Sequence, residues 1–440
     1  MSKVNVKRSS PLVTHEGGPA REINAFWNLK RSLMACMLWE DTFYEEGVEI
    51  SKRIKKLVKE VKPEEAKNLA IEARENMKIR HAPLWVVRAM AQLPEHKKLV
   101  AETLERVIQR PDELTEFLAL YWLNGKQPLS NQVKKGLAKA FTKFDAYQLA
   151  KYNRDGQVKL RDVMFLTHPK PLNLEQEEIW EQLVDGTLLP PDTWEVELSS
   201  GKDKKETWER LLSQNKLGAL ALLRNLRNME EVGVNRKLII EALRRMKTEK
   251  VLPFRFIAAA RYAPSLEPYL EEAMFKCIPQ DKKIQGKTIL LIDVSLSMTD
   301  PISKKSEMTR MDAAAGLAIL AREMCEEVNV YTFSDNEKLV PPRRGFALRD
   351  AIVNSQSHNG TYLGRSISAI NQKEQYDRII VFTDEQSADS VPAPESRGYM
   401  INVANYENGV GYGSWTHIDG FSEAVIDYIL EYEKLINNNY

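Results

Sequence analysis

The sequence predicts a mainly α-helical part in residues 1–280, followed by an α/β part that contains a parallel sheet. In the first part, apolar residues such as Ala66, Leu69 and Ala70 recur at the three- to four-residue spacing of a helix face, and few stretches alternate with period two. From Thr288 onward, short apolar runs alternate with helical segments. This alternation is typical of a parallel sheet that helices cover on both faces.

Amphipathic helices are expected to follow one another through the first part. Pro63 opens one of them, with acidic residues in its first turn, and Ser130 is a suitable N-cap for another. Many short helices with short connections favour an α-solenoid of stacked helix pairs, although the chain has no strict sequence repeat. Further helical runs are expected at Lys97–Arg110, Ser130–Phe144, Lys205–Asn215 and Asn235–Thr248.

The pattern changes near Pro279, so the two predicted domains are 15–280 and 284–440. Ligands of parallel sheets bind at the carboxyl ends of the strands, and Asp293 and Asp384 each stand at such an end. The expected strands are Thr288–Ile292, Val328–Phe333, Arg378–Phe382 and Tyr399–Ala404, and the expected helices are Met311–Glu327, Leu363–Ile370 and Phe421–Ile436.

Five polar residues form a candidate metal site. Asp293, Ser295 and Ser297 stand at alternate positions directly after a strand, where a carboxylate and two hydroxyl groups can face one point. Thr361 lies in a glycine-flanked loop before a helix. Asp384 follows the predicted strand Arg378–Phe382. Such oxygen ligands suit a hard divalent cation.

The motif D-x-S-x-S, with an apolar strand before it and a G-T-x-L-G loop after it, resembles the metal-ion-dependent adhesion site of von Willebrand factor A domains. The resemblance implies that Ser295, Ser297 and Thr361 bind the cation directly and that Asp293 and Asp384 support them. Mixed hydroxyl, carboxylate and water ligation fits Mg²⁺. The alternative is a degenerate domain that keeps the fold and binds no metal.

The composition indicates the cellular compartment of the protein and the chemical class of its partner. An apolar content of 43% and a charged content of 28% are those of a soluble globular protein, and no stretch approaches the about 18 apolar residues of a membrane span. The three cysteines, Cys36, Cys277 and Cys325, are scattered and favour a reducing cytoplasm. Residues 1–280 hold 47 Lys and Arg against 39 Asp and Glu, a modest surplus that hints at a polyanion partner.

Several stretches of the helical part resemble one family. Lys151–Gly156, Leu160–Pro171, Leu220–Met229 and Leu252–Arg255 look like the TROVE domain of the Ro ribonucleoprotein autoantigens. In that family a ring of HEAT-like helical repeats is closed by a von Willebrand A domain. The resemblance covers roughly residues 15–435 and matches the order of the two parts.

The resemblance implies a monomeric, non-catalytic RNA-binding protein. It implies that a basic outer surface binds small noncoding Y RNAs and that the ring admits single-stranded 3′ ends of misfolded RNAs. The protein would then act in RNA quality control or as a ribonucleoprotein scaffold, in some cases with an exoribonuclease tethered through the RNA.

Lys151 and His168 match family residues that touch RNA, whereas the intervening family arginine aligns with Asp155, one place from Arg154. Cationic side chains contact phosphates, and aromatic or imidazole rings stack on unpaired bases. His168 could instead simply end a helix before a proline, and the two arginines of Leu220–Met229 could pair with acids on a neighbouring helix. The predicted RNA-contact residues are Lys151, Tyr152, Arg154, His168, Lys170, Arg224 and Arg227.

Two other function classes stay open. In one, the helical part is a scaffold and the metal site captures an acidic side chain of a protein partner, as a metal-dependent adhesion module. In the other the chain is an enzyme, which the sequence disfavours because it lacks an H-E-x-x-H motif, a Walker loop and a C-x-x-C pair. The adjacent acids Asp384 and Glu385 are better explained by metal ligation than by a two-metal nuclease site.

Overall fold

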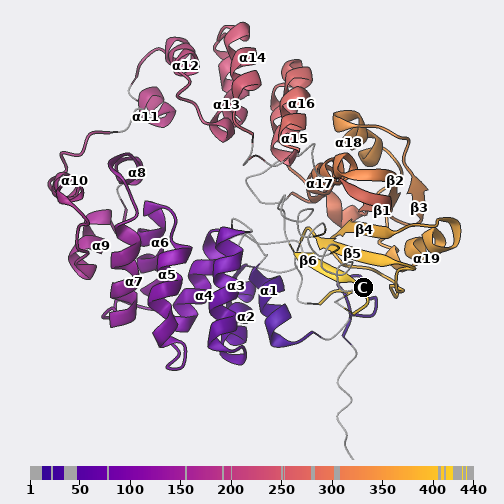
Figure 1. Cartoon of the computed structure of the whole chain (residues 1–440), viewed down its shortest axis with the longest axis horizontal. Helices are drawn as coiled ribbons and strands as arrows, with labels where there is room; N and C mark the ends of the chain where they lie inside the picture. The colour runs from indigo at the N-terminus through magenta and orange to yellow at the C-terminus, as the bar shows by residue number, and fades with distance from the viewer. Residues whose placement is uncertain are drawn as a thin grey trace, which may run out of the picture. The chain divides into compact units, whose positions relative to one another are not determined.

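The structure is a computed structural model that divides into two compact units (Figure 1). The α/β unit comprises the described residues up to Arg31 and from Ile278 onward, and the helical unit comprises those from Ser32 to Cys277. Helix α1 (Ala25–Leu33) contributes to both, and the predicted domain boundaries stay predictions. The structure describes residues 12–20, 23–33, 47–76, 79–153, 156–190, 193–199, 201–248, 251, 253–278, 283–301, 308–404, 408–410, 413–419, 429 and 433.

The helical unit is built from short helices joined by short connections, as the periodicity predicted. Its helices, within the described residues, are α2 (Gly47–Glu60), α3 (Pro63–Glu75), α4 (His81–Ala91), α5 (Val100–Val107), α6 (Pro111–Tyr121), α7 (Asn131–Phe141), α8 (Ala146–Tyr152), α9 (Leu160–Thr167), α10 (Leu174–Asp185), α11 (Trp194–Ser199), α12 (Lys204–Ser213), α13 (Ala219–Glu231), α14 (Arg236–Arg245), α15 (Pro253–Tyr262) and α16 (Glu267–Lys276), with 3₁₀ turns at Lys97–Leu99 and Pro264–Leu266.

Alternate helices pack side by side, which is the arrangement of a solenoid of helix pairs. Helix α3 packs on α5, α5 on α7 and α7 on α9, while α4 packs on α6 (Figure 1). The same pattern returns where α12 packs on α14, α14 on α16 and α13 on α15. The predicted helical-repeat fold is therefore confirmed, whereas closure of a ring stays a prediction because it depends on how the two units are placed.

Local signals position several of these helices. Pro63 is the first residue of α3, where its missing N–H removes no helical hydrogen bond. The Ser130 hydroxyl accepts a hydrogen bond from the Val133 amide and so caps α7, as predicted. The predicted runs Lys97–Arg110 and Asn235–Thr248 correspond to α5 and α14, each shorter than expected.

The α/β unit contains a sheet whose strand order, within the described residues, is β3-β2-β1-β4-β5-β6. All neighbouring strands are parallel except β3, which runs antiparallel to β2 at one edge. The strands are β1 (Ile284–Asp293), β2 (Cys325–Phe333), β3 (Glu337–Leu339), β4 (Arg378–Thr383), β5 (Arg397–Asn402) and β6 (Thr416–Asp419).

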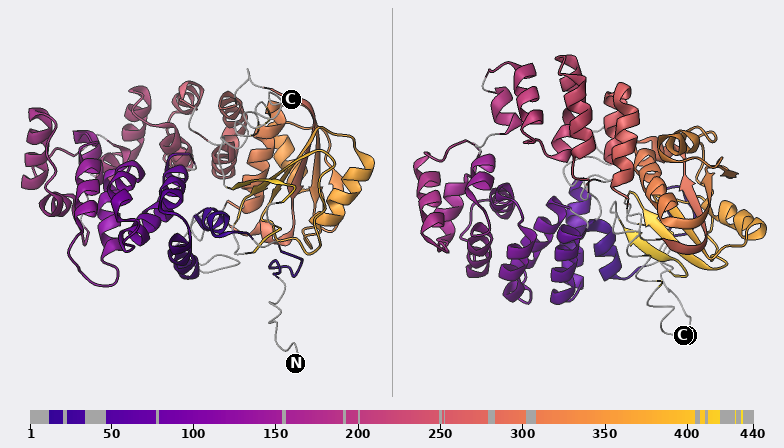
Figure 2. Two further views of the ribbon diagram at one scale, coloured as in Figure 1. Left: turned by 60° about the horizontal axis from the view of Figure 1, so that its bottom comes forward. Right: turned by 45° about the horizontal axis from the view of Figure 1, so that its top comes forward.

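Helices cover both faces of this sheet, as the left view of Figure 2 shows. Ile289 and Leu291 of β1 pack in one apolar cluster with Leu363 and Ile367 of α19 (Leu363–Lys373). Because strand side chains alternate, Leu290 and its alternate neighbours face the other side, where α17 (Arg310–Met324) packs on β1. The Ala-rich face of α17 is buried and allows this close approach, and α18 (Gly345–Val353) packs on α17.

The α/β prediction is confirmed in type and differs in its boundaries. The predicted helix Met311–Glu327 ends at Met324, because the next residues pair as part of β2, with Cys325 opposite Ile284. This pairing partner is remote in sequence and therefore gives no local signal. The short elements β3, α18 and β6 were not predicted, and the predicted helix Phe421–Ile436 lies almost wholly outside the described residues.

The structure also bears on the expectations about membrane spans and cysteines. No helix in the described part of the chain combines the length and the apolar content that crossing a membrane requires. Cys277 and Cys325 are free thiols, and Cys36 lies outside the described residues.

Gly364→Ala is expected to lower the unfolding temperature of the α/β unit. A Cβ atom at Gly364, in the first turn of α19, would lie 2.0 Å from the carbonyl oxygen of Ser390, which is backbone and cannot rotate away. Such overpacking typically costs about 1–3 kcal/mol. Thermal unfolding measures the change, with the exposed Ser368→Ala one turn further along the helix as control. Equal unfolding temperatures for the two variants would contradict the packing described here.

Candidate metal site and nucleic-acid interface

The predicted metal residues gather at the switch point of the sheet. Strands β1 and β4 are neighbours in the middle of the sheet. After β1 the chain continues to β2, on one side of this pair, and after β4 it continues to β5, on the other side. Asp293 is the last residue of β1, and Asp384 directly follows β4. Both carboxyl ends therefore open into the crevice where parallel sheets bind ligands.

A buried hydrogen-bond network joins four of the five residues. The Asp293 carboxylate accepts hydrogen bonds from the Ser295 amide at 2.9 Å and from the Thr383 hydroxyl at 2.7 Å. The Ser297 hydroxyl donates to Asp384 at 2.7 Å and lies 3.3 Å from the Ser295 hydroxyl. The residues of the D-x-S-x-S motif thus lie together with Asp384 in one hydrogen-bond network, and their role as metal ligands stays a prediction.

The loop that carries Thr361 is bonded to both neighbouring loops. The Leu296 amide donates to the carbonyl of Asn359, and the Ala388 amide donates to the carbonyl of Thr361 at 2.8 Å. Thr361 itself is buried. The structure therefore brings all three predicted loops together at this edge of the sheet.

Charged groups are concentrated at this edge of the sheet. Burial, together with the nearby charge of Asp384, raises the pKa of Asp293 to about 7, although hydrogen bonds from Ser295 and Thr383 act in the opposite direction. Arg310 forms an ion pair with Asp384, with 3.7 Å between the guanidinium nitrogen and the carboxylate oxygen. Two buried carboxylates and three hydroxyl groups are oxygen ligands of the kind that a hard divalent ion such as Mg²⁺ takes.

Hydroxyl groups are essential to this fit. In the described part of the chain, no three His, Cys, Asp or Glu side chains gather as a metal-ligand cluster. Sequence reasoning missed Asp300, whose partly buried carboxylate feels the charges of both Arg310 and Asp384. Burial raises the pKa of Asp300, and its position three residues after Ser297 was a signal that could have indicated it.

A buried ion cluster holds the backbone directly after Asp384. The Arg31 guanidinium of α1 donates to Glu385 at 2.7 Å, and the His417 imidazole of β6 contacts the other oxygen of the same carboxylate. Burial alone would raise the pKa of Glu385, but the charges of Arg31 and His417 hold it below its usual range. The N-terminal segment joins them, because the Thr14 hydroxyl donates to the Ser387 carbonyl at 2.6 Å.

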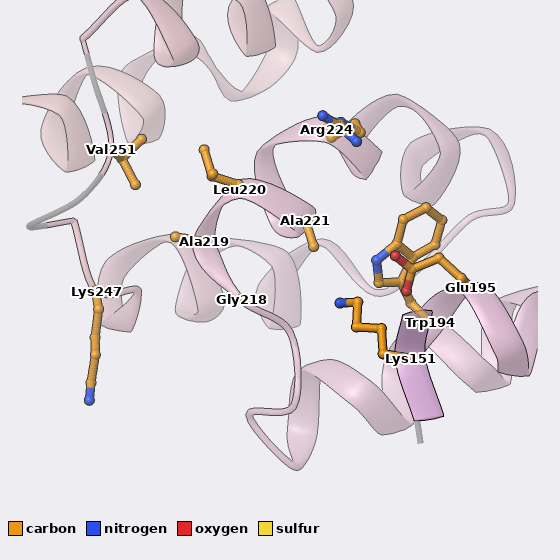
Figure 3. Close-up of a pocket in the computed structure, with 10 residues that line it drawn as sticks. All are labelled: Lys151, Trp194, Glu195, Gly218, Ala219, Leu220, Ala221, Arg224, Lys247 and Val251. Atoms are coloured by element: carbon orange, nitrogen blue, oxygen red, sulfur yellow. The ribbon is translucent and has the colours of Figure 1, made fainter. Parts of the chain in front are cut away.

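Two of the predicted RNA-contact residues line one open cavity. Lys151, near the end of α8, and Arg224, on α13, border a space of about 440 Å³ (Figure 3). Tyr152 is half-buried, and the guanidinium of Arg110 lies 4.6 Å from its ring centre. The Tyr152 ring therefore already has an intramolecular contact with Arg110.

The remaining predicted RNA-contact residues differ in their surroundings. Arg227 pairs with Glu231 on its own helix and lies over the ring of Tyr262, so its acidic partner is not on a neighbouring helix as the alternative expected. His168 ends α9 in the left-handed conformation, with φ 48° and its amide bonded to Met164. Its side chain is nevertheless exposed, as is that of Lys170, and Arg154 lies outside the described residues.

The fold and the edge site define a class: a helical-repeat unit joined to a von Willebrand A-like α/β unit. The crystal structure of the Deinococcus radiodurans RO (RSR) protein has the same fold, with a TM-score of 0.58 and 18% identity over 89% of this chain and 96% of that chain. The model of the TROVE domain matches residues 28–188 and 180–283. The chain therefore belongs to the TROVE domain family, which confirms the resemblance found in the sequence.

Curated relatives share only part of their length with this chain. Telomerase protein component 1 of Mus musculus is 27% identical over 230 residues, which are 49% of this chain and 8% of that protein. Telomerase protein component 1 of Rattus norvegicus is 35% identical over 89 residues, 19% of this chain and 3% of that protein. The chain thus spans less than a tenth of these relatives.

The raised pKa of Asp293 predicts an unusual pH dependence in metal-free protein. Between the ordinary value of 3.8 and about 7, the folded protein holds a proton that the unfolded chain has released. The free energy of unfolding should therefore fall as pH rises through this window and stay low above it. Asp293→Asn removes this titration and should raise the unfolding temperature in chelator at about pH 8, with little change at about pH 4.

Thermal unfolding in chelator at both pH values measures this effect. Asp350→Asn, on the exposed surface of α18, is the matched control and should leave the pH profile of the parent unchanged. A parent protein whose unfolding temperature rises from about pH 5 to about pH 8, with no gain from Asp293→Asn, would contradict the assignment.

Proposed function

We propose that this chain is a non-catalytic RNA-binding protein that works as part of a ribonucleoprotein. The observation that carries this proposal is the TROVE domain match, which spans nearly all of the helical unit. Family membership supports an RNA-binding role. The exposed cationic side chains of Lys170, Arg224 and Lys247 add the phosphate contacts that dominate affinity for RNA.

The more specific role that we propose is the binding of small structured noncoding RNAs, Y RNAs among them, and of single-stranded ends of misfolded RNAs. Lys151 and His168 are proposed contacts because they match the family pattern and stay at least partly accessible. RNA quality control and ribonucleoprotein scaffolding both follow from such binding. An exoribonuclease tethered through the RNA, a monomeric state and a cytoplasmic location belong to the same proposal.

A second candidate function concerns the edge of the sheet. We propose that Asp293, Ser295, Ser297, Thr361 and Asp384 hold Mg²⁺, which would leave an open position for an acidic side chain of a protein partner. The convergence of buried carboxylates and hydroxyl groups supports this adhesion-like role. It is compatible with RNA binding, because the two sites belong to different units.

Purified native protein is expected to carry a discrete small RNA that high salt removes. Affinity for single-stranded RNA should fall with the logarithm of salt concentration, with a slope of about −0.7 for each phosphate contact. Lys151→Ala combined with His168→Ala should reduce the bound RNA severalfold, because both side chains are proposed contacts. Sequencing of the co-purified nucleic acid at low and high salt measures this.

The matched control is Lys56→Ala combined with Lys59→Ala, which removes exposed cations from α2. Loss of RNA in both double variants would indicate only non-specific charge. A nucleic-acid content at background in the parent protein would contradict the proposed RNA-binding role and favour the adhesion role.

Asp293→Ala is expected to abolish Mg²⁺ or Mn²⁺ binding without unfolding the chain. The substitution removes one of two carboxylates at the site, and the remaining hydroxyl groups bind divalent ions weakly. Titration calorimetry measures the binding, with the exposed Asp350→Ala as control and circular dichroism as the check on folding. The metal assignment fails if the titration heats of Asp293→Ala equal those of the parent.

A further inference from the structure

The open cavity beside Lys151 combines cationic side chains with an aromatic ring. It lies wholly within the helical unit and is bordered by α8, α11, the first turns of α13 and the segment that follows α14 (Figure 3). Its volume of about 440 Å³ is within the about 300–1,000 Å³ of pockets that hold small ligands. Residues from both halves of the unit, more than 90 positions apart, therefore border one space.

The charge of this cavity is predominantly positive. Lys151, Arg224 and Lys247 line it, and Glu195 is the one acidic lining residue in the described part of the chain. Arg224 and Lys247 are exposed, and among the described residues none of the three cations forms an ion pair. Figure 3 shows Lys151 and Lys247 on opposite sides of the first turn of α13. The cations are thus spread along the cavity rather than clustered at one point.

An aromatic ring forms one wall. Trp194, the first residue of α11, is half-buried and stacks on the fully buried Trp208 with ring centres 5.8 Å apart and planes 24° from parallel. Trp194 also lines a second cavity of about 500 Å³, which Lys204 and Asn228 border. Trp194 therefore lines both cavities, and its stacking on Trp208 supports the ring from one side.

We propose that this double cavity holds an unpaired segment of RNA, with a base stacked on Trp194 and the flanking phosphates on Lys151, Arg224 and Lys247. The proposal rests on the proposed RNA-binding function and assigns one site to it. Aromatic walls with spaced cations recognise single strands, because every base offers a stacking face and the backbone charges follow at intervals. The bases of a duplex are stacked within it and cannot enter the cavity.

The test uses the full chain and a short fluorescent oligouridylate, with binding measured by anisotropy over a range of salt concentrations. Trp194→Leu should weaken binding about tenfold, as expected for one lost stacking contact, and should leave the salt slope unchanged. Lys247→Ala should reduce the salt slope by about 0.7, since it removes one phosphate contact from an exposed position. The two variants are therefore distinguished by the salt slope, which only Lys247→Ala is expected to reduce.

Trp122→Leu is the matched control, because Trp122 is also half-buried and also lies beside a lysine, Lys126, but borders neither cavity. It should bind the oligouridylate as the parent does. Thermal unfolding of each variant separates loss of the site from loss of the fold, and Lys247→Ala keeps the test valid if Trp194→Leu unfolds.

Wild-type affinity and salt slope in both cavity variants would overturn the site while leaving the proposed function intact, provided that the parent binds the probe. Displacement of the probe by oligoglutamate at equal charge concentration would also overturn it, because the cavity would then recognise only negative charge. A parent that carries native RNA but does not bind oligouridylate overturns the site alone. A parent that binds neither overturns the proposed function as well.

Discussion

Two carboxylates buried side by side at the end of neighbouring parallel strands impose the constraint on which the α/β unit depends. Asp293 cannot stay ionised in a dry environment without compensation, because burial and the nearby charge of Asp384 disfavour its charged form. The Thr383 hydroxyl, the Ser295 amide and the Ser297 hydroxyl all donate to the two carboxylates. The loops that supply these donors meet at this edge of the sheet, where we propose that a divalent cation binds.

The N-terminal segment extends this arrangement in an unexpected way. Arg31 and Thr14 bond to the residues that directly follow Asp384, together with His417 from the far end of the sheet. Glu385, at the centre of this cluster, has φ 62°, a conformation that is uncommon for residues with a side chain. The surrounding ion pairs stabilise it. The position of a proposed metal ligand therefore depends on a residue from the opposite end of the chain.

The helical unit obeys a different constraint. Each amphipathic helix can bury its apolar face only against neighbours, so alternate helices stack and leave the cationic side chains outside the core. Two buried exceptions have hydrogen-bond partners: Arg74 contacts the fully buried Glu113 at 2.6 Å and so ties α3 to α6, and Arg88 donates to the Leu120 carbonyl. Exposed cations such as Arg224 and Lys247 have no such partner among the described residues, which leaves them available to an anionic ligand.

The sequence by itself determined the helical-repeat and parallel-sheet fold, the D-x-S-x-S strand end and the family, because periodicity and motif spacing are local properties of the chain. It also placed Asp293 and Asp384 at one edge, since parallel strands align their carboxyl ends. Only the tertiary structure decided the start of β2 at Cys325 and the partnership of Arg31 with Glu385. It alone brought Trp194 beside Lys151 and Arg224, because contacts between residues far apart in sequence depend on how the elements pack.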